Sequence, residues 1–336
     1  MKIIEIYIFR HIQICIIMLK HLMIPQDTFQ KPLVEKYRPK CFDDIIFNKF
    51  LSKKFKTMVK NNLIQDMILT GEPSTGKTST ALFLGNKIFN NKNILELNAS
   101  DDRGLNVITN LILPFCKKKT DGLKLIILDE ADSITNKAQQ ILSNIMDEFK
   151  EKVKIIFICN DHNKISEVIQ TRCIIVNFPS IEKNNLKEKI ESIAQKENIK
   201  YDDYGLDKLL FYSNYDIRQC LNNLECIKYN DNYISEESVN NIIDKPKIEY
   251  IKNIFNFCKN HDLLKALKVM NEIINYGYNS CDILQIIQNY IRYELNDTNL
   301  INIYELTSKY YIIVNNGIDT KLQLNSYVCN LFKIYN

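Results

Sequence analysis

The sequence predicts an α/β fold in which a parallel sheet, covered by helices on both faces, is followed by two all-helical regions. Five short runs rich in apolar and β-branched residues alternate with stretches of helical periodicity such as 79–88 and 137–149. The runs are 67–70, 94–97, 123–128, 154–159 and 173–178. This alternation is typical of parallel strands joined by crossover helices. After Pro179 the β-rich runs stop and only helical periodicity remains.

The changes of pattern predict where the chain divides. A chain of 336 residues favours two or three domains. We expect a leader of unknown role at 1–31, a sheet domain at 32–180, a first helical region at 181–244 and a second at 245–336. Within the last region, Gly277 and Gly317 are the expected helix breaks.

Composition describes an ordinary globular protein. Apolar residues make up 46% and charged residues 25%, and the net charge is only +4, so any contact with nucleic acid must come from a local patch. Ten cysteines without a C-x-x-C pair predict reduced core residues. The leader is apolar but interrupted by Glu5, Arg10 and Lys20, so we expect neither a membrane span nor a secretory signal.

The strongest motif is the sequence GEPSTGKT at 71–78, which follows a predicted strand and precedes a predicted helix. Glycines in the spacing G-x-x-x-x-G-K-[ST] let backbone N–H groups face phosphate oxygens beside a helix N-terminus. Lys77 is expected to reach the β- and γ-phosphates and Thr78 to offer its hydroxyl to Mg²⁺. The motif therefore predicts binding of a purine nucleoside triphosphate, and ATP is the nucleotide that we expect.

A second motif, ILDEAD, ends an apolar strand about fifty residues after the loop. Asp129 is expected to hold Mg²⁺ and Glu130 to polarise the attacking water as a general base. We interpret Asp132 as an acid that marks the turn. Asn160 follows the next predicted strand, so it should emerge at the same sheet edge as Asp129 and orient water near the γ-phosphate.

Six segments in order carry a resemblance to a known family. They are VEKYRP at 34–39, the loop at 71–78, ELNASDDRG at 96–104, LDEADS at 128–133, QTRC at 170–173 and DIRQCLNNL at 216–224. Together they resemble the small subunits of replication factor C, the eukaryotic clamp loader among the AAA+ ATPases, and most of all the one called subunit two. The resemblance covers residues 32–336 and implies an AAA+ domain, a helical lid and a helical collar that holds five subunits in a ring.

The resemblance also implies roles for residues that the motifs alone leave open. Tyr37, Arg38 and Pro39 would line the adenine and ribose, and Asn160 would be the first sensor. Arg218 would be the second sensor, reaching the γ-phosphate from the lid, whereas Arg172 would be an arginine finger for the neighbouring subunit's ATP. The expected nucleotide-binding set is Val34, Tyr37, Arg38, Pro39, Gly71, Glu72, Pro73, Ser74, Thr75, Gly76, Lys77, Thr78, Ser79, Asn160 and Arg218.

The chain departs from the family pattern at several positions. Glu72 and Ser74 replace the first proline and the middle glycine of the loop, and Ser143 and Asn144 stand where the family has two arginines. Tyr215 replaces the glycine ahead of the lid's Asp-x-Arg. We expect nucleotide binding to survive in weakened form and contact with DNA phosphates to be weaker.

Three functions remain open at this point. The first is an ATP-hydrolysing subunit of a hetero-pentameric clamp loader that opens the PCNA sliding clamp and loads it on primer-template DNA. The second is a mainly structural ring member that binds nucleotide and donates Arg172. The third is another AAA+ machine, such as a branch-migration ATPase. Replication implies a nucleus, and the abundance of Ile, Asn and Lys is compatible with a relic nucleus and an AT-rich genome.

Overall fold

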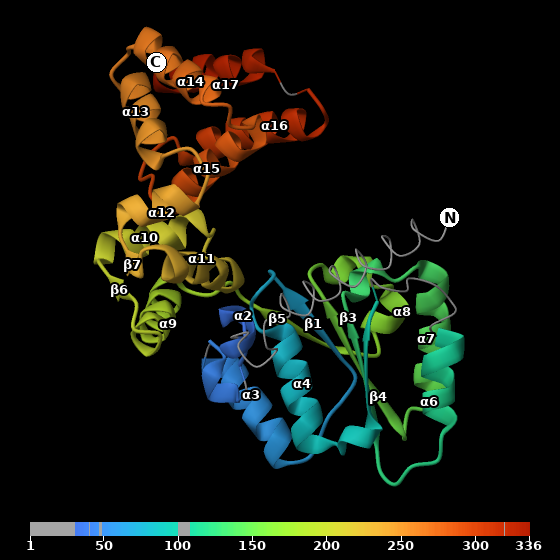
Figure 1. The fold of residues 1–336 in the computed structure, drawn as a ribbon. Helices are drawn as coiled ribbons and strands as arrows, with labels where there is room; N and C mark the ends of the chain where they lie inside the picture. The colour runs from blue at the N-terminus through green and yellow to red at the C-terminus, as the bar shows by residue number, and fades with distance from the viewer. Residues whose placement is uncertain (1–30, 40, 47–48, 100–107, 319) are drawn as a thin grey trace, which may run out of the picture. The chain divides into compact units, whose positions relative to one another are not determined.

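The structure is a computed structural model that describes residues 31–39, 41–46, 49–99, 108–318 and 320–336 (Figure 1). The chain separates into two compact units, 1–38 and 39–336, which are described separately. The first unit contributes one short helix, α2 (Leu33–Lys36), to the described residues. Residues 1–30 of the predicted leader and most of the ELNASDDRG motif, at 100–104, lie outside them. Every other element belongs to the second unit.

A five-stranded parallel sheet forms the first part of the second unit. Its strands run in the order β2-β3-β4-β1-β5. They are β1 (Met67–Gly71), β2 (Ile94–Asn98), β3 (Lys124–Asp129), β4 (Val153–Cys159) and β5 (Ile174–Phe178). Each end lies within one residue of the prediction, so the α/β parallel-sheet fold class is confirmed.

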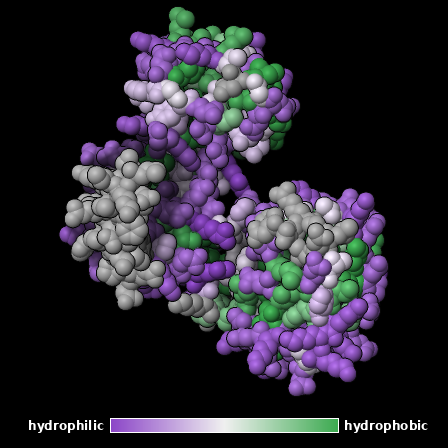
Figure 2. Space-filling model, turned by 45° about the vertical axis from the view of Figure 1, so that its right-hand side comes forward, coloured by the Kyte–Doolittle hydropathy of each residue, from purple (hydrophilic) through white to green (hydrophobic). Residues whose placement is uncertain are grey.

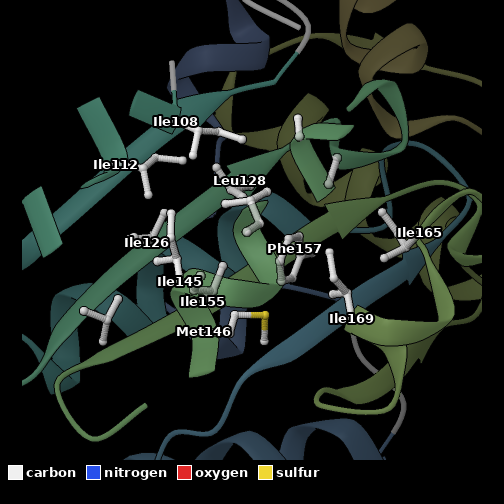
Figure 3. Packing of buried hydrophobic residues seen from close by; sticks show 14 of the residues in the cluster. Ile108, Ile112, Ile126, Leu128, Ile145, Met146, Ile155, Phe157, Ile165 and Ile169 are labelled. Atoms are coloured by element: carbon white, nitrogen blue, oxygen red, sulfur yellow. The ribbon is translucent and has the colours of Figure 1, made fainter. Parts of the chain in front are cut away.

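Two apolar clusters cover the two faces of this sheet, because successive side chains of a strand point to opposite faces. On one face, Ile126 and Phe157 pack with Ile145 of α7 and with neighbouring apolar side chains (Figure 3). On the other face, Ile127 and Ile156 belong to the second cluster, which includes Leu84 of the helix that follows β1. Burying each such side chain contributes about 1.5–3 kcal/mol. Both faces of the central strands are therefore mostly apolar.

One helix before β1 and the connections between the strands supply the covering helices. They are α3 (Lys49–Lys60), α4 (Lys77–Ile88), α6 (Leu113–Lys117), α7 (Asn136–Glu148) and α8 (Glu167–Gln170). A π-helical turn at Ile108–Ile112 precedes α6, and 3₁₀ turns lie at Phe42–Asp44, Asn91–Asn93, Ala131–Ser133 and His162–Lys164. The predicted helices 79–88 and 137–149 correspond to α4 and α7. The hydrophobic pattern thus indicated two of these helices, whereas α3, α6 and α8 were not predicted.

The expected lid contains a small sheet as well as helices. Its helices are α9 (Lys183–Lys196), α10 (Asp203–Tyr212), α11 (Ile217–Asn230) and α12 (Glu236–Ile242). Between them β6 (Lys200–Tyr201) pairs in parallel with β7 (Tyr233–Ile234), which the sequence did not indicate because each strand is two residues long. A Cβ at Gly205 would lie 2.7 Å from the Ile234 carbonyl oxygen, so this glycine lets α10 approach β7.

The C-terminal region is entirely helical in the residues described. Its helices are α13 (Ile248–Lys259), α14 (Leu263–Asn275), α15 (Ser280–Tyr293), α16 (Leu300–Asn315) and α17 (Lys321–Tyr335). Gly277 and Gly317 follow α14 and α16 at φ angles of 90° and 93°, as helix-ending glycines do. Both predicted breaks are confirmed.

The surface is mostly hydrophilic on the face drawn in Figure 2, with hydrophobic residues scattered among polar ones. No helix among the described residues is long and apolar enough to cross a membrane. The prediction that cysteines are core residues holds for Cys116, Cys159, Cys220 and Cys258, but Cys41 and Cys226 are exposed.

Candidate nucleotide-binding site

The loop at 71–78 connects β1 to α4, as predicted, and glycines determine its path. Gly71 has a φ of 143°, and a Cβ there would lie 2.3 Å from the carbonyl oxygen of Phe178 in β5. Gly76 has a φ of 90° and precedes the first residue of α4. Because side chains are excluded at both positions, the backbone can fold closely around a ligand at the helix N-terminus.

A pocket of about 200 Å³ lies over this loop. It is lined by most of the predicted site residues, which come from the loop, from the ends of β3 and β4, and from the start of α11. The lining residues are Pro73, Ser74, Thr75, Gly76, Lys77, Thr78, Ser79, Asp129, Glu130, Asp132, Ile158, Cys159, Asn160 and Arg218. Tertiary structure therefore brings together groups that are up to 145 positions apart in the chain.

Lys77 is buried at the base of the pocket. Its ammonium group donates hydrogen bonds to the carbonyl oxygens of Gly71 and Glu72, at 2.8 and 2.7 Å, and to Asn160 Oδ1 at 3.2 Å. Burial lowers the pKa of Lys77. The cation is thus held by three neutral acceptors, which leaves its charge available to an anion.

Thr78 and Asp129 form the part of the pocket suited to a metal ion. The Thr78 hydroxyl donates to Asp129 Oδ2 at 2.7 Å. Two oxygen ligands at this distance could share one hard cation, so the pair fits the Mg²⁺ that accompanies a nucleoside triphosphate. The loop and this pair together fit the triphosphate end of ATP.

Glu130 stands next to this pair in a strained backbone conformation. Its φ of 52° and ψ of 39° are left-handed, and its N–H donates to Asp129 Oδ1 at 2.9 Å. Its own carbonyl accepts a hydrogen bond from the Ser133 hydroxyl at 2.8 Å. The carboxylate is exposed and makes no hydrogen bond with the described part of the chain. Backbone strain of this kind clusters at active sites and ligand-binding positions.

Arg218 reaches the pocket from the first turn of α11. Asp216 caps this helix, because its Oδ1 accepts from the N–H groups of Arg218 and Gln219 at 2.7 and 3.3 Å. The same carboxylate accepts a hydrogen bond from the Ser74 hydroxyl at 2.9 Å. The phosphate loop is therefore tied directly to the helix that carries Arg218.

Arg172 does not line this pocket. Its guanidinium makes a two-point contact with Asp147, with distances of 2.9 and 2.8 Å, and donates to the Val168 carbonyl at 2.7 Å. The contact is exposed to solvent on both sides. Arg172 is therefore available to a group outside its own nucleotide site.

The residues expected around the base and ribose fall on both sides of the division between units. Val34, Tyr37 and Arg38 belong to the first unit. Pro39 begins the second unit and is absent from the pocket lining.

Glu72 turns away from the phosphate site. Its carboxylate accepts a hydrogen bond from Ser180 Oγ at 2.8 Å and lies 3.6 Å from the Arg292 guanidinium. The side chain is about half exposed, at 56%. The added negative charge is therefore compensated outside the pocket and not directed at the phosphates.

Three lining residues were missed in the sequence. Asp132 was interpreted as a turn former, although its place three residues after Asp129 was a usable signal. Ile158 and Cys159 form a wall from the end of β4, which only strand order reveals. Burial raises the pKa of the Cys159 thiol to about 11, so this sulfur is a neutral packing group and not a nucleophile.

The sheet order, the strand-loop-helix at 71–88 and the acidic strand end of β3 define the class of protein: a P-loop ATPase of the AAA+ type. Residues 67–180 match the ATPase family associated with various cellular activities. Residues 183–241 match the RFC1-like AAA+ ATPase lid domain, and residues 246–330 match the replication factor C C-terminal domain.

Similar proteins extend over nearly the whole chain. Replication factor C subunit 4 of Saccharomyces cerevisiae is 31% identical over 92% of this chain and 98% of its own length. Replication factor C subunit 2 of Arabidopsis thaliana is 32% identical over 79% of this chain and 83% of its own. The chain belongs to the replication factor C small-subunit family. Since subunits 2 and 4 match almost equally, the likeness to subunit two stays a prediction.

Solved structures support the fold alone. A Thermotoga maritima RuvB Holliday junction branch migration motor superimposes with a TM-score of 0.53 over 80% of this chain and 89% of its own, at 16% identity. Identity this low carries no argument about function. The superposition shows only that the sheet and the following helices are arranged as in that structure.

Proposed function

We propose that this chain is an ATP-hydrolysing subunit of a clamp loader, which uses ATP to open the PCNA sliding clamp and load it on primer-template DNA. The observation that carries the proposal is the convergence of Lys77, the Thr78–Asp129 pair, Glu130 and Arg218 on one pocket. These groups supply what phosphoryl transfer to water needs: a phosphate cradle, a metal site, a base and a cation for the γ-phosphate.

Each residue has a distinct task in this proposal. Thr78 and Asp129 would hold Mg²⁺, which would neutralise charge on the phosphate oxygens. Glu130 would accept the proton of the attacking water, and Asn160, held by Lys77, would orient that water. Arg218 would contact the γ-phosphate.

Completion of the site would come from a neighbouring subunit. Arg172 lies outside its own pocket in an exposed ion pair, so it would serve as the arginine finger of the adjacent ATP site. Its release from Asp147 would expose a rigid planar cation at the subunit boundary. Other replication factor C subunits, in a hetero-pentamer, are the partners that this role requires.

We also propose the boundaries 32–180 for the ATPase domain, 181–244 for the lid and 245–336 for the collar. The end of β5 at Phe178 and the start of α9 at Lys183 support the first boundary. The gap between α12, ending at Ile242, and α13, beginning at Ile248, supports the second. Val34, Tyr37, Arg38 and Pro39 would lie around the base and ribose.

A replication role favours the nucleus as the site of action, and relatives from yeast and a plant are consistent with it. The narrower prediction of a relic nucleus has no support from these relatives. The alternative that the chain is a branch-migration motor is not favoured either, because the chain resembles such a motor only in fold, at 16% identity.

The test is reconstitution with candidate loader subunits. We expect ATPase activity that rises on addition of PCNA and primer-template DNA, together with co-purification of the subunits. An ATPase indifferent to both clamp and DNA would contradict the loader proposal. A complex whose ATPase is unchanged by Glu130→Gln would instead favour the mainly structural role.

A further inference from the structure

Two residues beside the pocket occupy backbone conformations that favour glycine. Ser74 has a φ of 62° and Tyr215 a φ of 56°. Side chains at such angles crowd the following carbonyl oxygen, and each of these two positions is one where the family has glycine. A strained residue that persists needs compensating contacts from its side chain.

The contact of Ser74 reaches the lid. Its hydroxyl donates to Asp216 Oδ2 at 2.9 Å, while Asp216 Oδ1 caps α11 through the N–H of Arg218. A glycine at position 74 has no hydroxyl and cannot make this bond. One carboxylate thus joins the phosphate loop to the first turn of the helix that carries Arg218.

Tyr215, the residue before Asp216, is held by contacts with Tyr293 at the end of α15 and Lys183 at the start of α9. Its ring lies 4.4 Å from that of Tyr293, between centroids, and Lys183 Nζ lies 4.8 and 4.4 Å from the two ring centroids. Lys183 also donates to the Tyr293 carbonyl at 3.2 Å. The peptide preceding Asp216 is therefore anchored to the end of α15, so the carboxylate has little freedom to move away from Ser74.

We propose that Ser74 is a positioning residue that keeps Arg218 beside the phosphate loop, so that the site favours ATP over ADP. The inference rests on the proposed contact of Arg218 with the γ-phosphate. With the lid tied to the loop, Arg218 is already oriented when ATP arrives, and binding spends less free energy on ordering it. ADP has no γ-phosphate, so its affinity gains nothing from this preorganisation.

The test measures the affinities of the full chain for ATPγS and ADP, both with Mg²⁺, by calorimetry. Ser74→Ala should weaken ATPγS binding about fivefold to tenfold, the usual net effect of one intramolecular hydrogen bond, and leave ADP within about twofold. Ser74→Gly should change the ratio equally, since it also removes the hydroxyl while relieving the backbone strain. Retained ADP binding shows that both variants are folded.

The partner variant is Asp216→Ser. Serine caps a helix as well as aspartate does, but it has no second oxygen to accept from Ser74. Combining Ser74→Ala with Asp216→Ser should weaken ATPγS binding no more than the stronger single change, because both delete the same bond. The matched control is Ser192→Ala in α9, whose hydroxyl bonds only the Lys189 carbonyl among the described groups; it should leave both affinities unchanged.

Arg218→Ala separates failure of this inference from failure of the proposed role of Arg218. If Arg218→Ala lowers ATPγS affinity and Ser74→Ala does not, the positioning role is wrong and the role of Arg218 stands. If Arg218→Ala leaves the ratio unchanged, the γ-phosphate contact itself is wrong, and the inference falls with it. Equal losses of ATPγS and ADP affinity in Ser74→Ala would mean that the hydroxyl only supports the loop, which would also overturn the inference.

Discussion

Replacing Glu130 by glutamine isolates the chemical step from binding and folding. The backbone of Glu130 is held on both sides, by its N–H on Asp129 and by its carbonyl on Ser133, so glutamine should keep the same left-handed conformation. The side chain is exposed, so the free energy of unfolding should change by no more than about 0.5 kcal/mol. What the substitution removes is the basicity of the carboxylate.

The expected loss follows from that single change. A positioned general base contributes about 10²–10⁴ in rate, or about 2.7–5.4 kcal/mol of barrier. Hydrolysis at this site should therefore fall at least about a hundredfold, while ATP binding persists, because Lys77 and the Thr78–Asp129 pair are untouched. The variant should hold ATP without turning it over.

The assay must separate this site from those of other subunits. In the reconstituted complex, with clamp and DNA, Glu130→Gln should abolish the same share of steady-state ATPase as Lys77→Ala, which empties the site. Filter binding should show that the Glu130→Gln complex retains ATP that the Lys77→Ala complex loses. Wild-type turnover in Glu130→Gln, alongside a deficit in Lys77→Ala, would refute the assignment of Glu130 as the base.

Three further predictions concern the lid, the subunit boundary and the isolated chain. Lys208 is 6% exposed and donates to Glu236 and Glu249 at 2.6 and 2.5 Å. Lys208→Met should lower the free energy of unfolding by about 1–2 kcal/mol in urea titrations, less than for a fully buried pair because both glutamate side chains are partly exposed, at 41% and 44%. Burial acts to raise the pKa of Glu249, but the hydrogen bond from Lys208 helps to hold this pKa below the ordinary 4.5. The stabilisation by the ion pair is therefore present above pH 4.5, and the difference in unfolding free energy between wild type and variant should shrink as the pH falls below that value. A difference that stays constant with pH would contradict the pairing. Arg172→Ala should abolish ATP hydrolysis at the neighbouring subunit's site and spare nucleotide binding by its own chain. Asp147→Ala, which only releases the arginine from its ion pair, should retain ATPase activity. Equal ATPase activity in the two variants would contradict the role of Arg172 as an arginine finger. The isolated chain should be a weak ATPase that partner subunits stimulate, and full activity alone would show that the site needs no neighbour.

Much of the sheet domain was readable from the sequence, and the reason is local. Strand and helix periods are properties of consecutive residues, so the runs at 67–70 and 154–159 indicated β1 and β4 to within a residue. The order of Gly, Lys and Thr in one loop predicted a phosphate site without any knowledge of the fold. By contrast, β6 and β7 are two residues each and leave no periodic signal.

The direction of individual side chains was decided by tertiary structure. By sequence, Glu72 is a carboxylate in the phosphate loop where the family has proline, yet its carboxylate binds Ser180 and lies near Arg292. Asp132 is a turn acid by sequence but also lines the pocket, because the 3₁₀ turn Ala131–Ser133 that carries it follows β3 directly. Partners so far apart in the chain can be found only once strand order and helix docking are known.

The phosphate loop shows most clearly which features follow from the sequence alone and which depend on the tertiary structure. Its residues alone determined that the chain binds a nucleoside triphosphate, because glycine spacing, a lysine and a hydroxyl are enough to form the cradle. Ser74 looked only like a departure that strains the backbone. The structure places its hydroxyl on Asp216, 142 residues later, and so converts the departure into a link between loop and lid. A hydrogen bond between distant residues depends on the packing of two regions, and no local pattern encodes it.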